Sequence, residues 1–464
     1  MRFSLGWTLM FTLAAILVAS CETSSQDGQG GQGGSAGSGG SAGEGGAGGL
    51  GGTAGAGGSG GVGGAAGAAG AGGSGGAAGA AGAGGLGGSG GLGGAGGALP
   101  APLVFITASS GTANLSTWAL AGGNTGLAAG DAVCQAEADA AGLEGIFVAW
   151  LSDDSDDAYC RIHGLSGKKA DSCGEDVLPS SAGGWRRPDG VAFAAGIGDL
   201  VEGRVFVPIR ITASGDPPQF GRGFVGRTWT GTDASGEVLE PLCSAWAGTA
   251  GSGRTGDKDG VGTSWTHGGT SPCDSDGQYL FCFQLGEGPS LKPPQATGKI
   301  AFVTSARGSG DLSTWADAGG NAGVAAADAI CQARATAASL PNAMRFKAWI
   351  STETSLVYDR ITSDGPWVRP DGLPLADSHA DLFDEELFTG ILVDEMGEMV
   401  GPSVVWTGFH PDLDQQLTHC LAWTSESIDE LGYSGFTQNA GVTATSGTRS
   451  RCNTGNQRLY CFED

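Results

Sequence analysis

The segment after Pro100 contains one sequence pattern twice, and this duplication constrains the fold more than any other feature. The sequence Leu-Ser-Thr-Trp-Ala at 115–119 returns at 312–316, and Asp-Ala-Val-Cys-Gln-Ala at 131–136 returns at 328–333 with Ile in place of Val. Later pairs are 149–152 with 348–351, 187–190 with 369–372, 229–231 with 406–408, and 280–283 with 459–462. The pattern predicts a first copy over 101–286, a proline-containing linker over 287–297, and a second copy over 298–464.

The cysteines follow the same duplication. Eight of the eleven recur, four in each copy and in the same order, while Cys160 and Cys173 lie in an insertion of the first copy. Without Cys21 the number is even, as expected for a disulfide-bonded chain in an oxidising compartment. None of the ten lies in a Cys-x-x-Cys pattern, which argues against structural zinc.

Local sequence predicts a mixed architecture in each copy. In the first copy, Val, Phe, Ile and Thr predict an opening strand at 104–107, and helical spacing of apolar residues predicts a helix at 128–142 that ends at a glycine. Further strands are expected at 147–151, 224–229 and 279–285. Few helices and many short strands punctuated by glycine indicate an α+β fold rather than βαβ units.

The N-terminus is typical of an export signal. Arg2 precedes an apolar run from Leu5 to Val18, which is too short to be a permanent membrane span. Cys21 directly follows Ala-Ser and so resembles the cysteine of a bacterial lipobox. That resemblance implies a signal peptide over 1–20, lipidation of Cys21, and an exported protein anchored by lipid at the outer membrane and cell surface. The alternative is an ordinary signal peptide that contains a cysteine.

Residues 21–100 are expected to form a glycine-rich stalk. Every third residue from Gly28 to Gly97 is glycine, a period that permits a collagen-like or polyglycine helix. The repeat contains no proline, however, so ordering it would cost the full backbone entropy of glycine. We therefore expect a disordered spacer.

Charge limits the classes of partner. The chain has 48 Asp and Glu against 23 Lys and Arg, for a net charge of −25. Nucleic acid is not an expected partner because phosphate binding needs a clustered cationic surface. Anionic lipid surfaces and heparin-like polyanions are disfavoured for the same reason.

The repeated motifs resemble the endostatin-like domain, a variant of the C-type lectin-like fold found in bacterial endostatin-like surface lipoproteins. In the first copy the resemblance rests on Cys-Gln-Ala at 134–136, the segment 147–152, Cys-Ser-Ala-Trp at 243–246 and the segment 280–283. The second copy fits through Cys331, Trp349, Trp406, the segment 420–423 and Cys461. The resemblance implies two tandem domains, each with a helix packed beside a twisted antiparallel sheet and closed by two nested disulfides.

Carried over by position, the resemblance pairs Cys134 with Cys282 and Cys243 with Cys273. In the second copy it pairs Cys331 with Cys461 and Cys420 with Cys452. Cys160 and Cys173 then remain and most simply pair with each other.

No cofactor or metal is expected, apart from weak Ca²⁺ binding as an alternative. C-type lectins bind Ca²⁺ through Glu-Pro-Asn or Gln-Pro-Asp and Trp-Asn-Asp motifs, whereas this chain has only Glu-Pro-Leu at 240–242. Acidic runs could bind Ca²⁺ at extracellular levels but are more often solvated loops; they are Asp153, Asp154, Asp156, Asp157, Asp384, Glu385, Glu386, Asp394, Glu395 and Glu398. The histidines, none at metal-ligand spacing to another, are His163, His267, His379, His410 and His419.

No catalytic residues are predicted, because hydrolase and phosphate-binding motifs are missing outside the glycine-rich stalk. Asp189 and Asp371 could be posed as acids, but each lies in Arg-Pro-Asp-Gly, whose last three residues are a turn signature. Four tryptophans near glycine-rich loops are candidates for ligand contact, with covering of the core as the alternative that we prefer: Trp118, Trp185, Trp315 and Trp367.

Together these features favour a non-enzymatic binding or adhesion protein for an extracellular protein or polysaccharide. Two tandem modules would gain avidity for a repetitive ligand. Alternatives are a structural cell-envelope protein without a specific ligand, a Ca²⁺-assisted carbohydrate-binding module, and a hydrolase that uses two carboxylates of the acidic loops.

Overall fold

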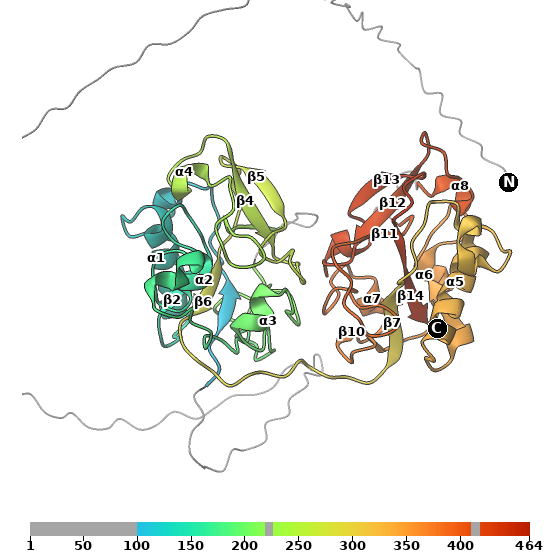
Figure 1. Ribbon diagram of the computed structural model, residues 1–464, viewed down its shortest axis with the longest axis horizontal. Coiled ribbons are helices and arrows are strands. Elements are labelled where there is room, and N and C mark those ends of the chain that lie inside the picture. The colour runs from blue at the N-terminus through green and yellow to red at the C-terminus, as the bar shows by residue number, and fades with distance from the viewer. Residues whose placement is uncertain (1–99, 219–225, 410–417) are drawn as a thin grey trace, which may run out of the picture. The chain divides into compact units, whose positions relative to one another are not determined.

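The computed structural model describes residues 100–218, 226–409 and 418–464 (Figure 1). The expected signal peptide, Cys21 and the glycine-rich stalk lie outside the described residues, apart from Pro100. No helix within the described ranges has the length and apolar character needed to cross a membrane.

The first copy contains two small antiparallel sheets. One has the order β1-β6-β2 and the other the order β3-β4-β5. The strands are β1 (Val104–Ile106), β2 (Phe147–Ala149), β3 (Arg227–Trp229), β4 (Ser252–Asp257), β5 (Gly269–Pro272) and β6 (Phe281–Gln284). β6, with the sequence Phe-Cys-Phe-Gln, is the central strand of its sheet, and Cys282 lies between Phe105 and Ala149.

The second copy repeats this order, with the two sheets joined. β14 lies between β7 and β8 and also pairs in parallel with β11. β11 pairs with β12, and β12 pairs with β13. The strands are β7 (Lys299–Val303), β8 (Phe346–Ala348), β9 (Trp367–Val368), β10 (Pro374–Ala376), β11 (Val404–Trp406), β12 (Leu431–Phe436), β13 (Thr448–Arg451) and β14 (Arg458–Glu463). In the first copy, a single parallel bridge from Thr228 to Tyr279 replaces the β11–β14 pairing.

One long helix recurs in each copy and packs on the neighbouring strand, α1 on β2 and α5 on β8 (Figure 1). The α-helices are α1 (Gly126–Ala140), α2 (Ala158–Arg161), α3 (Ile197–Val201), α4 (Cys243–Trp246), α5 (Gly323–Ala337), α6 (Val357–Arg360), α7 (His379–Leu382) and α8 (Cys420–Trp423). Short 3₁₀ turns are η1 (Leu115–Thr117), η2 (Lys169–Gly174), η3 (Leu312–Thr314), η4 (Ala316–Ala318), η5 (Ala343–Arg345) and η6 (Val442–Ala444). The expectation of a mixed α and β fold with few helices is confirmed.

Five disulfides join the ten described cysteines in the pairs that were expected. They are Cys134–Cys282, Cys160–Cys173, Cys243–Cys273, Cys331–Cys461 and Cys420–Cys452. The first and fourth tie the long helix of each copy to its central strand, β6 or β14. In each copy this bond fixes the helix to the sheet beside a buried apolar cluster.

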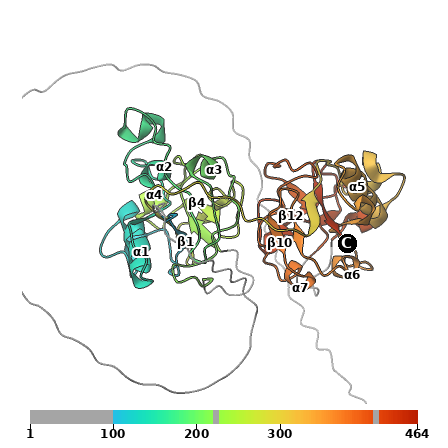
Figure 2. The ribbon, with the colours of Figure 1, turned by 90° about the horizontal axis from the view of Figure 1, so that it is seen from below.

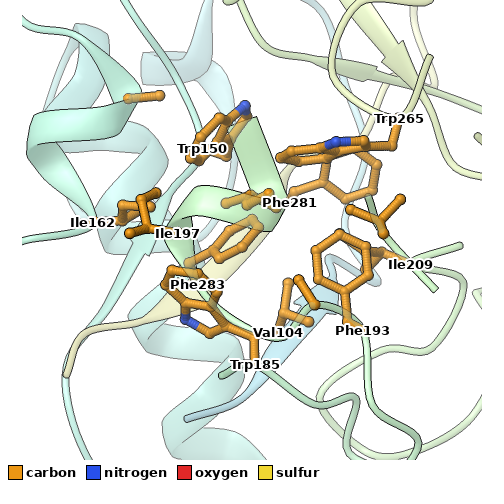
Figure 3. Close-up of a cluster of buried hydrophobic side chains, with 14 of the residues drawn as sticks. Val104, Trp150, Ile162, Trp185, Phe193, Ile197, Ile209, Trp265, Phe281 and Phe283 are labelled. Carbon is orange, nitrogen blue, oxygen red and sulfur yellow. The ribbon is translucent and has the colours of Figure 1, made fainter. Parts of the chain in front are cut away.

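Aromatic rings fill much of the first copy's core (Figure 3). Trp150 lies 5.0 Å from Trp265 and 5.3 Å from Phe283 between ring centroids, and Trp185 meets Phe283 edge to face. Ile162, at the end of α2, belongs to the same buried cluster. The chain segment that follows α2 is therefore anchored in the buried core at its first end.

In each copy an arginine that follows the strand beside the long helix folds back onto that strand. Arg161 forms an ion pair with Asp131 and donates to the carbonyl oxygens of Ala149 and Leu151, both at 3.0 Å. Arg360 repeats the arrangement with Asp328, as well as with the carbonyl oxygens of residues 348 and 350. These contacts fix α2 and α6 to the strands before them.

Candidate binding groove in the first copy

The first copy carries an insertion directly after α2. The sequence Tyr-x-Arg-Ile ends at Ile162 in the first copy and at Ile361 in the second, and the next matching residues are Trp185 and Trp367. Between them the first copy has residues 163–184, whereas the second has only residues 362–366. The extra chain lies at an edge of the first copy (Figure 2).

Several bonds hold this insertion in place. The Cys160–Cys173 disulfide joins α2 to η2, and the Asp157 carboxylate accepts the backbone N–H of Lys169 at 2.8 Å. The Tyr159 hydroxyl donates to the Pro179 carbonyl oxygen at 2.5 Å. At its end, the insertion pairs with the chain after β6 through a bridge between Gly183 and Glu287. The insertion is thus a clamped loop.

The loop and the chain after β6 enclose a groove of about 460 Å³. Its apolar lining includes Ile162 and Ala182, which are buried, and Leu165 and Pro179, which are half-buried. Val177 belongs to the same lining but is 77% exposed.

Carboxylates give the groove its charge. Glu175, Asp176 and Glu287 line it and are exposed, and no lysine or arginine is part of the lining. Among the described residues, none of the three carboxylates forms an ion pair with a basic side chain. The Ser181 hydroxyl donates a hydrogen bond to Glu287. The groove is therefore both apolar and anionic.

His163 lies in the lining as a neutral side chain. Its Nδ1 is 2.8 Å from the Tyr159 carbonyl oxygen, which can only accept, so Nδ1 carries the proton and Nε2 is left as an acceptor. Burial lowers the pKa of His163, against a smaller opposing effect of the Glu287 charge. Its Nε2 is buried and has no hydrogen-bond partner among the described residues. The imidazole therefore does not offset the carboxylate charge at neutral pH.

The four tryptophans considered for ligand contact are buried, which agrees with the preferred core-covering alternative and not with ligand contact. Each exposes 7% or less of its surface, and each indole N–H donates to a backbone carbonyl oxygen within its own copy. With their donors satisfied and their rings covered, Trp118, Trp185, Trp315 and Trp367 offer no aromatic surface to a ligand.

The acidic runs are used largely for local hydrogen bonding. Asp153 accepts the backbone N–H groups of Ser155 and Asp156, and Asp394 accepts those of Met396 and Glu398. Within the part of the chain that the structure describes, no three His, Cys, Asp or Glu side chains are grouped so as to hold a metal ion.

The other candidate acids and histidines have structural contacts. Asp189 and Asp371 pair with the arginine of their own Arg-Pro-Asp-Gly turn, which confirms the turn prediction. His419 accepts the Ala422 backbone N–H at 2.8 Å and so caps α8. His379 contacts the Ile361 carbonyl oxygen at 2.8 Å. His410 lies outside the described residues.

Sequence reasoning did not identify the groove. The insertion and its extra cysteine pair were visible in the sequence. Which of these residues line a groove, however, depends on how the ends of the loop are held in the folded chain. Comparison with protein-family models and with curated proteins found no match for this chain. The functional argument therefore depends on the residues themselves.

Proposed function

We propose that this protein is a surface-anchored binding protein that captures an extracellular ligand in the groove of its first copy, without catalysing a reaction. In this proposal Cys21 carries the lipid anchor, the glycine-rich segment is the spacer, and the two copies are endostatin-like domains of the C-type lectin-like class. The observation that carries the proposal is the clamped insertion that lines a groove on one copy of a duplicated scaffold.

Three features of the structure support this proposal. Recognition commonly resides on loops held by a rigid scaffold, and here a disulfide and a buried aromatic core hold the loop. The groove has the size of a ligand pocket and combines apolar walls with a few polar groups. In the second copy, by contrast, residues 362–366 form only a short connection in place of the insertion. The Asp464 carboxylate holds this connection by accepting the backbone N–H groups of Thr362 and Ser363.

A loop exchange tests the proposal. In the full chain, residues 163–184 are replaced by the five residues Thr-Ser-Asp-Gly-Pro of 362–366, and Cys160 is replaced by Asp, as at the matching position 359. Wild type and variant are then screened on arrays of extracellular-matrix proteins and glycans. We expect wild type to bind at least one ligand and the exchanged chain to lose it.

A second variant controls for a change in the first copy outside the groove, and thermal unfolding of the loop-exchanged chain verifies that it remains folded. Glu240→Gln changes an exposed acid elsewhere in the first copy and should bind like wild type. Absence of any ligand for the folded wild-type chain would contradict the proposed function. Unchanged binding by the loop-exchanged chain would place the site elsewhere.

A further inference from the structure

We infer that the groove binds a lysine- or arginine-containing segment of an extracellular protein. This inference rests on the proposed function and names its ligand class. It combines two properties of the lining: three exposed carboxylates that have no basic partner among the described residues, and an apolar wall next to them.

The chemistry of the lining matches that of a long basic side chain. Lysine and arginine have an apolar stem and a charged head, so one side chain can cover the half-buried Leu165 and Pro179 while its head meets a rim carboxylate. Arginine adds a planar group that can bond a carboxylate through two N–H groups. The groove of about 460 Å³ exceeds one side chain and has room for a short peptide segment.

Other ligand classes fit less well. The lining contains no tryptophan, tyrosine or phenylalanine, so a sugar ring has no aromatic face to stack on. An acidic polysaccharide or a phosphorylated peptide would meet Glu175, Asp176 and Glu287 as like charges. A purely apolar segment would leave these carboxylates partly dehydrated without compensation.

The test must separate a site from general attraction to an acidic protein. The probe is a fluorescein-labelled peptide, acetyl-Gly-Arg-Leu-Arg-Gly, and its partner carries citrulline, the neutral isostere, in place of both arginines. Fluorescence polarisation with the full chain is measured in 150 mM NaCl, where the Debye length is about 8 Å and distant charges are screened. We expect the arginine peptide to bind and the citrulline peptide to bind at least tenfold more weakly.

Two triple variants of equal charge change locate the binding. The groove variant is Glu175→Gln with Asp176→Asn and Glu287→Gln. The control is Asp359→Asn with Glu386→Gln and Glu398→Gln, all exposed in the second copy. We expect at least a tenfold loss of affinity in the groove variant and less than twofold in the control. Thermal unfolding of both variants verifies that they remain folded.

Each other outcome overturns the inference. Equal losses in both triple variants would indicate general electrostatic attraction, and equal binding of the two peptides would show that charge is not recognised. Displacement of the peptide by free spermidine at lower concentration than by unlabelled peptide would identify a small polyamine as the ligand. If the arrays give a ligand that depends on the insertion but not on the three carboxylates, the inference fails while the proposed function stands.

Discussion

Four glycines make room for four buried tryptophan rings. A Cβ atom added to Gly111 would lie 2.7 Å from Nε1 of Trp118, and one added to Gly308 would lie 2.1 Å from Nε1 of Trp315. The same relation holds for Gly183 with Trp185 and for Gly365 with Trp367. At these four positions the glycine lets the backbone lie in close contact with a tryptophan ring. This explains why the loops around these rings contain glycine although the rings are not exposed.

Gly308→Ala should destabilise the protein by about 1–3 kcal/mol, because the new methyl group has no space beside the Trp315 ring. The measurement is the free energy of unfolding in urea, with tryptophan fluorescence as the signal. Gly401→Ala is the matched control, since a Cβ at that position meets no atom within 4 Å. A Gly308 variant as stable as the Gly401 variant would contradict the packing described.

Single residues also show which contacts could be predicted from the sequence and which could not. The duplication identified Asp131 and Asp328 as repeated positions but not their partners, Arg161 and Arg360. The Tyr-x-Arg-Ile sequence that contains each arginine recurs too, yet recurrence alone does not say that the guanidinium is buried against two carbonyl oxygens. That contact depends on how α2 packs on β2, which is a property of the folded chain.

At the scale of elements, conventional patterns were recognised and glycine-rich strands were missed. The expected helix at 128–142 corresponds to α1, two residues earlier, and the strands at 104–107 and 147–151 correspond to the slightly shorter β1 and β2. β4 was not expected, because Ser-Gly-Arg-Thr-Gly-Asp has no apolar alternation. Its glycines instead allow close contact, with Gly253 against the Cys243 sulfur and the Trp229 ring.

The turn α8 has a left-handed backbone, with φ between 48° and 66° at all four residues. Such a conformation costs about 1–2 kcal/mol per residue for residues with a Cβ. The disulfide at Cys420 and the hydrogen bond from the Trp423 indole to the Ser351 carbonyl oxygen hold it in place. α4 has the same backbone in the first copy, so both copies contain this strained turn.

Ala422→Gly should stabilise the protein by about 0.5–1 kcal/mol, because glycine adopts φ near 56° without steric cost. The same substitution in an ordinary helix, Ala333→Gly in α5, should instead destabilise it by about 1 kcal/mol. Chemical denaturation of both variants measures the difference. If both substitutions reduce the free energy of unfolding, the left-handed turn is not strained as described.

The disulfides should differ in their contribution to stability according to the chain length they close. Cys134–Cys282 spans 148 residues and Cys160–Cys173 spans 13, for which the loop-entropy model gives about 5 and 3 kcal/mol. We expect Cys134→Ala with Cys282→Ala to lower the free energy of unfolding more than Cys160→Ala with Cys173→Ala, as measured by urea denaturation. The reverse order would show that the insertion contributes more to stability than its length implies.

At the scale of the molecule, the described residues after Pro100 belong to one compact unit, in which the two copies contact each other. The backbone N–H of Val261 donates to the Gln438 carbonyl oxygen, and that of Ala440 donates to the Asp259 carbonyl oxygen at 2.9 Å. This contact could not be predicted from the sequence, because its residues lie outside the repeated motifs. Duplication therefore predicted the two copies but not how they join.

The junction contains a carboxyl group with a raised pKa. Asp257 accepts the Asn439 side-chain N–H at 3.0 Å, and burial, with a smaller effect of the neighbouring Asp259 charge, raises its pKa to about 6. Lys258 and Arg227 act in the opposite direction but do not cancel this effect. Asp259 itself contacts Lys258 and Arg210. Asp257 is thus the group at the junction whose charge changes in the mildly acidic range.

Because the pKa of Asp257 is about 6 in the folded chain and about 3.9 in an unfolded one, the folded protein binds the extra proton between these values. The stabilisation is present in full near pH 4 and is lost as pH rises through 6. We therefore expect a contribution of about 1–2 kcal/mol that favours pH 5 over pH 8, and Asp257→Asn, which carries no charge at either pH, should remove that dependence. Urea denaturation at pH 5, 6, 7 and 8 measures it, with Asp216→Asn as an exposed control that should keep the wild-type profile. A wild-type junction that gained stability on going from pH 5 to pH 8, relative to Asp257→Asn, would show that Asp257 is buried in its charged form and stabilised by Lys258 and Arg227 instead.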